Sequence, residues 1–335
     1  MLLTLLAGLA IAGCGGTTGT STNGRRGEPP PELPARFFAP DSVWNTPLPT
    51  DASLDPDSNV LSSALARQAE EIGSMVNTDR YSTPIYTVAA DQPGVRVQIN
   101  GADPALQRAV SEVPLPSGAQ PAVGTDRHLV VWQPSTDTMW EFWRLRRQNG
   151  RWFAGHGGRI TDVQKSPGYY RDRRSPDGKI IEERSWGATA TSLPLAAGTI
   201  TTTELRSGRI DHALALGVPE VRAGVVAFPA QRSDGRYSGS EAIPEGARFR
   251  LDPSVHVASL GLPPGLRAIA TAAQRYGMIV RDGSSAVSLY TQDPTPTGTD
   301  PYPALFSGLR PYKFAALFPW DRLQLTEMHL RPAPR

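Results

Sequence analysis

One stretch of this chain places a carboxylate, an imidazole and two indoles at strand-like spacing. It reads DRHLVVWQPSTDTMWEFWRLRR and runs from Asp126 to Arg147. The polar group at 133–137 separates two apolar runs, which predicts a hairpin with its tip at Ser135–Thr136. Position 130 then faces position 141 across the hairpin, and 132 faces 139. Side chains alternate between the two faces of a strand, so one face carries His128, Val130, Trp132, Met139, Glu141 and Trp143.

This predicted face suits a sugar ligand, because the flat rings of Trp132 and Trp143 are surfaces on which sugar rings bind. Asp126 and Arg144 lie next to this face in the sequence and are further candidates for substrate binding. A carboxylate among aromatic rings, such as Glu141, can act on a glycosidic oxygen.

The same residues also allow a purely structural interpretation. The two tryptophans would then fill a core, His128 would hydrogen-bond to the backbone, and Glu141 would cap an arginine. A buried glutamate is rare without a partner, so Glu141 requires an explanation under either interpretation.

A second candidate stretch, from Trp186 to Leu216, combines small residues with Glu204 and His212. The small residues at 187–192 allow the backbone to approach another group closely. Alternation over 210–214 places His212 on the apolar face, where it would form an acid–base pair with Glu204. In the alternative, Glu204 pairs with a nearby arginine on the surface, and His212 is a core histidine with its own partner.

The remaining motifs carry weaker signals. Asp282 and Gly283 predict a turn, so Asp282 is expected to be a turn former rather than a catalyst. His156, in the sequence Gly-His-Gly-Gly, would bind a metal only together with another histidine, and no ligand spacing supports this. The sequence lacks a nucleophile elbow, an HExxH motif, a P-loop and a dinucleotide glycine fingerprint. We therefore predict no cofactor and no metal.

The N-terminus predicts a lipoprotein. Residues 2–11 form an apolar run of signal-peptide length, whereas about twenty residues are needed to span a bilayer. The run ends at Ile-Ala-Gly-Cys, which resembles a lipobox, and Cys14 is the only cysteine of the chain. We therefore predict a signal segment at 1–14 and a flexible Gly/Ser/Thr/Pro tether at 15–35. The body would be extracytoplasmic and anchored to the membrane by lipid on Cys14.

Composition restricts the classes of protein to consider. The net charge is +2 over 335 residues, so no basic field indicates nucleic acid as a partner. With a single cysteine the body has no disulfide, and its stability must come from an apolar core. About 300 residues suffice for such a core. We predict a single β-rich domain at 36–335.

Short elements are expected throughout this body, because 32 prolines and 32 glycines interrupt the chain. Helical spacing and end signals predict two helices, at 58–74 and 263–276. Strands are predicted at 95–99, 128–132, 139–145, 247–251, 278–281, 287–290 and 321–328. Many short strands separated by turns favour a mainly β fold, an antiparallel, jelly-roll-like β-sandwich with one or two peripheral helices.

Six short segments form a distinctive set: DRH at 126–128, WEFW at 140–143, ATATSLP at 188–194, IDHAL at 210–214, ARFRL at 247–251 and YGMIVRDGS at 276–284. Together they resemble a family of uncharacterised secreted bacterial proteins. The resemblance covers most of the body, from Val43 to about Leu325. It implies secretion and carries no activity with it. The chain departs from the family pattern at Arg281, where a smaller residue is expected.

The leading functional hypothesis is a secreted glycoside hydrolase that acts on a polysaccharide or cell-wall glycan. Glu141 and Glu204 would be the carboxylate pair, facing each other across a groove. His128 and His212 would tune or orient these carboxylates. In a groove, burial would raise the pKa of Glu141.

Three alternatives remain open at this point. A polysaccharide lyase would use His212 with Tyr169 or Tyr170 as base and acid. A non-catalytic glycan-binding lipoprotein would need the aromatic side chains but not the carboxylates. In a structural envelope protein, the same residues would be buried and would satisfy one another.

Overall fold

The computed structural model describes residues 32–170, 173–174, 180–182 and 186–333. The predicted signal segment, the lipidation site Cys14 and most of the tether lie outside these residues. The described residues belong to one compact unit. Within it, the buried apolar side chains form two clusters.

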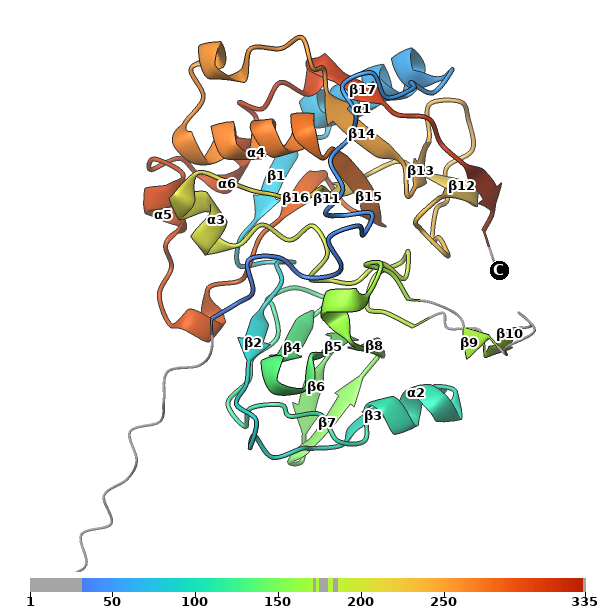
Figure 1. Ribbon diagram of the computed structural model, residues 1–335, viewed down its shortest axis with the longest axis vertical. Helices are drawn as coiled ribbons and strands as arrows, with labels where there is room; N and C mark the ends of the chain where they lie inside the picture. The colour runs from blue at the N-terminus through green and yellow to red at the C-terminus, as the bar shows by residue number, and fades with distance from the viewer. Residues whose placement is uncertain (1–31, 171–172, 175–179, 183–185, 334–335) are drawn as a thin grey trace, which may run out of the picture. The chain divides into compact units, whose positions relative to one another are not determined.

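The largest sheet has six strands in the order β1-β16-β11-β15-β14-β17 (Figure 1). β1 runs parallel to β16 and β11 runs parallel to β15, whereas the other neighbours are antiparallel. The strands are β1 (Ser74–Asn77), β11 (Leu214–Val218), β14 (Arg248–Leu251), β15 (Met278–Gly283), β16 (Val287–Tyr290) and β17 (Leu323–Leu325). This sheet and the helices packed on it enclose one apolar cluster.

The second cluster lies under the sheets of the segment between 85 and 161. A four-stranded sheet has the order β2-β4-β5-β8, and a three-stranded sheet has the order β3-β7-β6. The strands are β2 (Ile85–Thr87), β3 (Val97–Ile99), β4 (Leu129–Gln133), β5 (Thr138–Trp143), β6 (Arg146–Gln148), β7 (Arg151–Ala154) and β8 (His156–Thr161).

Two smaller sheets complete the strands of the described residues. One has the order β13-β12-β18, and the other pairs β10 with β9. The strands are β9 (Arg173–Arg174), β10 (Ile180–Glu182), β12 (Val221–Ala227), β13 (Ile243–Glu245) and β18 (Leu330–Pro332).

Both predicted helices are present. α1 (Ser58–Glu71) packs against β17, and α4 (Pro264–Arg275) packs against β14 and runs across the six-stranded sheet in Figure 1. The described residues also form four short helices, α2 (Pro104–Ala109), α3 (Thr202–Ser207), α5 (Tyr302–Leu305) and α6 (Pro311–Ala315). Single 3₁₀ turns lie at Pro134–Thr136, Val163–Lys165, Val257–Leu260, Thr295–Thr297 and Trp320–Arg322.

The prediction of a mainly β fold with peripheral helices is confirmed. The sheets are mixed, because five of the strand pairs in the described residues are parallel. Alternation of apolar and polar residues reports which face of a strand is buried. It does not report the direction of the neighbouring strand, so the sequence favoured antiparallel pairing throughout.

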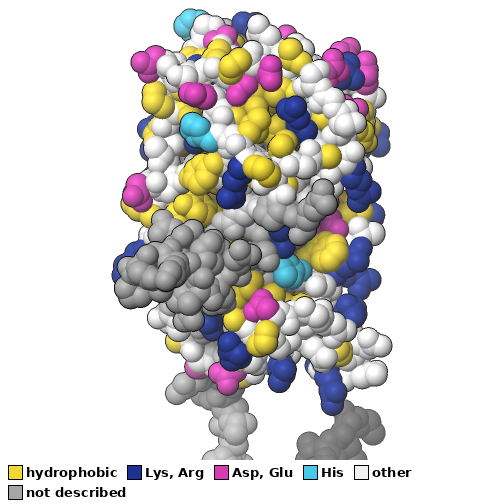
Figure 2. All heavy atoms as spheres, turned by 90° about the vertical axis from the view of Figure 1, so that its right-hand side faces the viewer, with side chains coloured by type: hydrophobic (Ala, Val, Ile, Leu, Met, Phe, Trp, Pro, Cys, Tyr) yellow, Lys and Arg dark blue, Asp and Glu magenta, His cyan; other side chains and the backbone are white. Residues whose placement is uncertain are grey.

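Within the described part of the chain, no helix combines the length and the apolar character needed to cross a membrane. On the face drawn in Figure 2, acidic side chains gather toward the top and basic side chains along the right-hand edge.

Candidate active site

A cleft of about 1070 Å³ is lined by residues from both the four-stranded and the six-stranded sheet. This volume suits a ligand the size of a drug molecule or of a short oligosaccharide. One part of the wall carries Asp126, His128, Trp143 and His156. Another part carries Asp282 at the end of β15, together with Arg232 and Asp234.

The hairpin β4–β5 positions the first part of the wall, and its register is the one predicted from the sequence. Val130 pairs with Glu141 in this hairpin, and Trp143 pairs with His156 of β8. His128 directly precedes Leu129, the first residue of β4. The residues His128, Trp143 and His156 therefore lie at one end of three neighbouring strands, where all three line the cleft.

Trp143 is held in place by two neighbours. Its indole N–H donates to Asp126 Oδ1 at 3.1 Å. The Arg144 guanidinium lies over the indole, 4.1 Å from the ring centroid, and the Arg144 side chain is exposed. Of the four residues predicted to bind substrate, Asp126 and Trp143 line the cleft, and Arg144 supports the indole.

His128 is the most buried ionisable side chain of this wall, with 3% exposure. Its Nδ1 has no hydrogen-bond partner among the described residues. Burial lowers the pKa of His128 to about 4, although Asp126 acts in the opposite direction. The imidazole is therefore neutral near pH 7.

Glu141 lies beneath the cleft and not in its wall, with 1% exposure. Its two carboxylate oxygens accept the N–H groups of Ala188 at 2.9 Å and of Leu195 at 2.7 Å. Burial raises the pKa of Glu141, and these two N–H groups partly offset the effect. The sequence predicted a raised pKa for a carboxylate that lines a groove, whereas here full burial raises it. The expectation that Glu141 lines a groove is wrong, because this carboxylate binds the backbone of the segment 187–195.

Glycines allow this close approach. Gly187 has a φ of +110°, and a Cβ placed there would lie 3.3 Å from Glu141 Oε1. A Cβ on Gly157 would lie 2.4 Å from the carbonyl oxygen of Glu141, and one on Gly158 would lie 2.2 Å from the Tyr170 hydroxyl. The small residues at 187–192 thus have the role predicted for them, and the Gly-His-Gly-Gly segment brings β8 close to β5.

Trp132 is a core residue, in contrast to its predicted role in binding sugar. It is 2% exposed and packs edge to face against Phe37, with 5.6 Å between the ring centroids. The faces of a strand were assigned correctly, but both β4 and β5 are buried along nearly their whole length. Alternation therefore could not distinguish a core face from a cleft face.

The second predicted pair forms at a different place. His212 Nε2 lies 3.0 Å from Glu204 Oε1, and His212 Nδ1 lies 2.8 Å from the carbonyl oxygen of Ala213. Burial alone would lower the pKa of His212, but the Glu204 carboxylate outweighs it and raises this pKa. Burial opposes ionisation of Glu204 as well, yet His212 lowers the pKa of Glu204.

Glu204 also caps the N-terminus of a helix. It is the third residue of α3, where its carboxylate accepts the backbone N–H and hydroxyl of Thr201 in a capping box. Glu204 and His212 line a cavity of about 20 Å³, room for about one water molecule. The expectation that Glu141 and Glu204 face each other across a groove is therefore wrong, since each carboxylate is engaged in its own buried contacts.

The residues of the lyase alternative do not line the cleft. Tyr170 is 3% exposed and packs near Gly158, and Tyr169 packs edge to face against Phe228 at 5.5 Å. His212 belongs to the small cavity described above.

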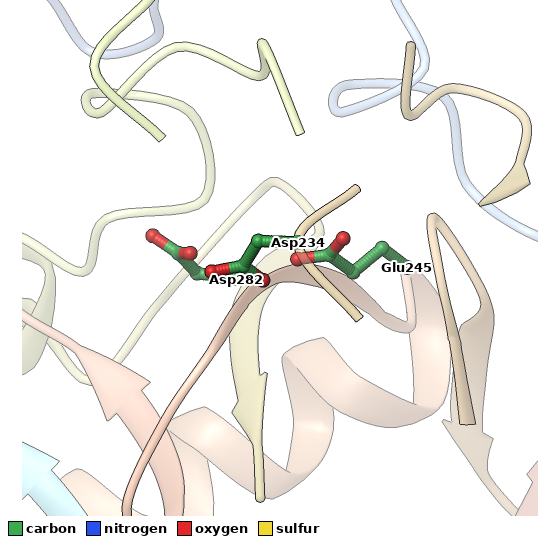
Figure 3. Close-up of side chains that lie close together, drawn as sticks. All are labelled: Asp234, Glu245 and Asp282. Carbon is green, nitrogen blue, oxygen red and sulfur yellow. The ribbon is translucent and has the colours of Figure 1, made fainter. Parts of the chain in front are cut away.

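The sequence pattern assigned Asp282 to a turn, and it did not single out Arg232, Asp234 or Glu245. Asp282 lies within β15, so the predicted turn at Asp282-Gly283 is wrong. Its nearest ligand oxygen lies within 4.8 Å of those of Asp234 and Glu245 (Figure 3). Burial, and then the neighbouring Asp234, raise the pKa of Asp282 to about 7 against the opposing charge of Arg281. Burial and the neighbouring Asp282 raise the pKa of Glu245 to about 9.

One signal in the sequence pointed toward Asp282. It follows the continuous apolar run Met278–Val280, which is typical of a strand buried on both faces. Such strands are often parallel, and side chains that follow them gather at the carboxyl edge of the sheet. β11 and β15 are a parallel pair of this kind, and the carboxyl end of β15 lines the cleft.

Comparisons with protein-family models, with curated proteins and with solved structures gave no match to this chain.

Proposed function

We propose that this protein is a glycan-cleaving enzyme and that its active site is the cleft lined by Asp126, His128, Trp143 and His156. The observation that carries the proposal is the convergence of these side chains with Asp282 and Arg232 on one cleft of about 1070 Å³. A large cleft with several ionisable groups is the usual form of an active site.

Asp126 and His156 are the proposed proton-transfer groups. Both are partly exposed to the cleft, and they flank Trp143. Asp126 accepts the indole N–H of Trp143, and His156 is the cross-strand neighbour of Trp143. A carboxylate and an imidazole that line the same cleft can donate and accept the proton that cleavage of a glycosidic bond requires.

The aromatic side chains would hold the sugar. Trp143, Tyr81, Tyr290 and Tyr312 contribute to the cleft wall, and Tyr312 is the most exposed of them at 38%. Apolar ring faces and edges bind the C–H faces of sugars, while the polar groups between them bind hydroxyls. The predicted ligand class, a polysaccharide or cell-wall glycan, is therefore kept, and the proposed site is moved from Glu141 and Glu204 to the cleft.

The test is a screen of the purified body for product release from plant, fungal and bacterial polysaccharides. Asp126→Asn and His156→Ala should each lower kcat/KM by about 100-fold or more while the free energy of unfolding stays unchanged. Asp321→Asn is the matched control, because it makes the same change at an exposed position outside the cleft. A wild-type value of kcat/KM in both cleft variants would contradict the proposal. Glycan binding without any product from the wild type would instead favour a non-catalytic binding protein.

The products also separate the two reaction types. Hydrolysis gives a new reducing end with saturated sugars, whereas elimination from a uronic acid gives an unsaturated product that absorbs in the ultraviolet. Measuring both in one reaction distinguishes a hydrolase from a lyase.

We further propose that the protein is an extracytoplasmic lipoprotein anchored through Cys14. The support is the apolar run that ends at the only cysteine. Cys14→Ser should move the protein from the membrane fraction to the soluble fraction of cells. Unchanged membrane association of this variant would contradict the anchor.

A further inference from the structure

Three carboxylates at the cleft form a cluster that the proposed reaction does not use. Asp234 lies in the loop after β12, Glu245 ends β13, and Asp282 lies in β15. Each offers one oxygen, and these oxygens all lie within 4.8 Å of one another. Figure 3 shows the three carboxyl groups in a row, with Asp234 between the other two.

The backbone fixes this arrangement. The N–H of Gly246 donates to the carbonyl oxygen of Val280 at 2.8 Å, and the N–H of Val280 donates to that of Ala247 at 2.9 Å. These two bonds hold the end of β13 against β15. A Cβ on Gly283 would lie 3.4 Å from Asp234 Oδ1, so the loop carrying Asp234 packs directly on β15.

Glu245 is the feature that points to a ligand. Its side chain is 0% exposed, and neither of its carboxylate oxygens has a partner with hydrogen-bond geometry among the described residues. The Ser233 hydroxyl and the Asp234 N–H lie near it and lower its pKa, but burial outweighs them. A buried carboxylate without a partner is costly, and buried charges in proteins are normally paired or bind metals. The carboxyl of Glu245 points toward those of Asp234 and Asp282, so it faces like charges.

Two arginines lie near the cluster and are engaged with backbone carbonyls. Arg281 Nη1 donates to the carbonyl oxygens of Leu195 at 2.6 Å and Ala197 at 3.0 Å. Arg232 donates to the carbonyl oxygens of Gly187, Thr189 and Ala190. Both guanidinium groups attract Asp282 at longer range, and Arg232 also attracts Glu245, but the N–H groups named here donate to the segment 187–197.

We propose that Asp234, Glu245 and Asp282 bind a hard divalent cation, Ca²⁺ or Mg²⁺, in the wall of the cleft. All three ligands are carboxylate oxygens, which these cations prefer, and the cluster contains neither a thiolate nor an imidazole. Asp234 is exposed and lines the cleft with Asp282, so the cation has a path from solvent. Water or a ligand in the cleft would complete the coordination shell. The proposal does not depend on glycan cleavage.

The experiment measures cation binding by the full chain. Protein is treated with a chelator and dialysed, and CaCl₂, MgCl₂ or MnCl₂ is added during calorimetric titration and thermal unfolding. One cation per chain should bind and raise the Tm, since a ligand at about 100 times its Kd shifts the folding equilibrium about 100-fold. Glu245→Gln and Asp282→Asn should each weaken binding by more than about tenfold, a loss seen even for residues behind a metal ligand.

Two matched variants serve as controls. Glu327→Gln and Asp321→Asn make the same changes at exposed positions and should bind the cation like the wild type. If Glu245→Gln fails to fold, Asp234→Asn removes a ligand from an exposed loop and gives the same test. Absence of stoichiometric binding of all three cations, or unchanged Kd in the folded Glu245 and Asp234 variants, would overturn the proposal.

Discussion

The buried carboxylate of Glu141 accepts the backbone N–H of Leu195 at 2.7 Å, although the two residues are 54 positions apart in the chain. Its other oxygen accepts the N–H of Ala188 at 2.9 Å. One side chain thus fastens both ends of a segment to β5. The cleft is lined by Thr189 and Ala190, near the start of this segment, and by Gly187, which directly precedes it. Glu141 therefore positions part of the cleft wall although it does not line the cleft itself.

Glu141→Gln should therefore act on stability first. The amide has one acceptor oxygen, so one of the two N–H groups would face an NH₂ group instead of an oxygen. We expect a loss of about 1–3 kcal/mol in the free energy of unfolding, measured by urea denaturation. The exposed Glu327→Gln is the control and should change this free energy by less than about 0.5 kcal/mol. Wild-type stability of Glu141→Gln would show that the two contacts carry little energy.

The His212–Glu204 ion pair should produce a stability maximum in mildly acidic solution. The folded pKa of His212 is raised, so its contribution is complete below its ordinary value of 6.5 and is lost as the pH rises through the folded pKa. The folded pKa of Glu204 is lowered, so its contribution is present above 4.5 and is lost as the pH falls through the folded pKa. The pair therefore contributes most between pH 4.5 and 6.5.

Glu204→Gln should remove this maximum. At pH 6 the variant should be less stable by about 3 kcal/mol, because a buried pair loses one partner. At pH 9 the difference should be smaller, because the contribution of His212 is lost as the pH rises through its folded pKa. Denaturation across this pH range checks both statements, and a difference independent of pH would rule out the ion pair as its cause.

His128 should destabilise the folded protein as the pH falls, in contrast to His212. Burial lowers the pKa of His128 from 6.5 to about 4, so the unfolded chain binds a proton more readily than the folded chain between these values. Stability should fall by about 3 kcal/mol from this group as the pH decreases from 6.5 to 4. His128→Gln should remove that part of the slope. An identical slope in variant and wild type would contradict the buried, neutral imidazole.

Gly157→Ala should destabilise the sheet that carries the first wall of the cleft. The added Cβ would lie 2.4 Å from the backbone oxygen of Glu141, and backbone cannot move aside as a side-chain end can. We expect a loss of about 1–3 kcal/mol in urea denaturation. Gly118→Ala is the matched control, since a Cβ there meets nothing within 4 Å and its φ is not positive. Equal stability of the two variants would mean that β8 can shift away from β5.

Local pattern predicted the elements well. Helices at 58–74 and 263–276 were predicted from spacing and end signals, and they form at Ser58–Glu71 and Pro264–Arg275. The pairing of Val130 with Glu141 was predicted from the length of one loop. These features depend on residues close together in the chain, where the geometry of a turn or a helix fixes the outcome.

The site was predicted only in part. Asp126, His128 and Trp143 do line the cleft. In contrast, Glu141, Trp132 and the Glu204–His212 pair are buried in the interior, away from the cleft. The sequence places His128, Trp132, Glu141, Trp143 and His212 on inward faces. An inward face becomes a core or a cleft wall according to what packs opposite to it, and that partner comes from a distant segment.

The sequence by itself therefore determined the mainly β composition, the two longer helices, the register of one hairpin and the presence of charged groups on inward faces. Only the tertiary structure decided that Asp282, Asp234 and Glu245 meet, because they lie on three separate segments of the chain. The hydrogen bonds between Val280 and the residues after β13 bring two of these segments together. Contacts between such segments depend on which strands pair and in which direction. Those choices result from burying the whole apolar surface at once, and a local pattern does not contain them.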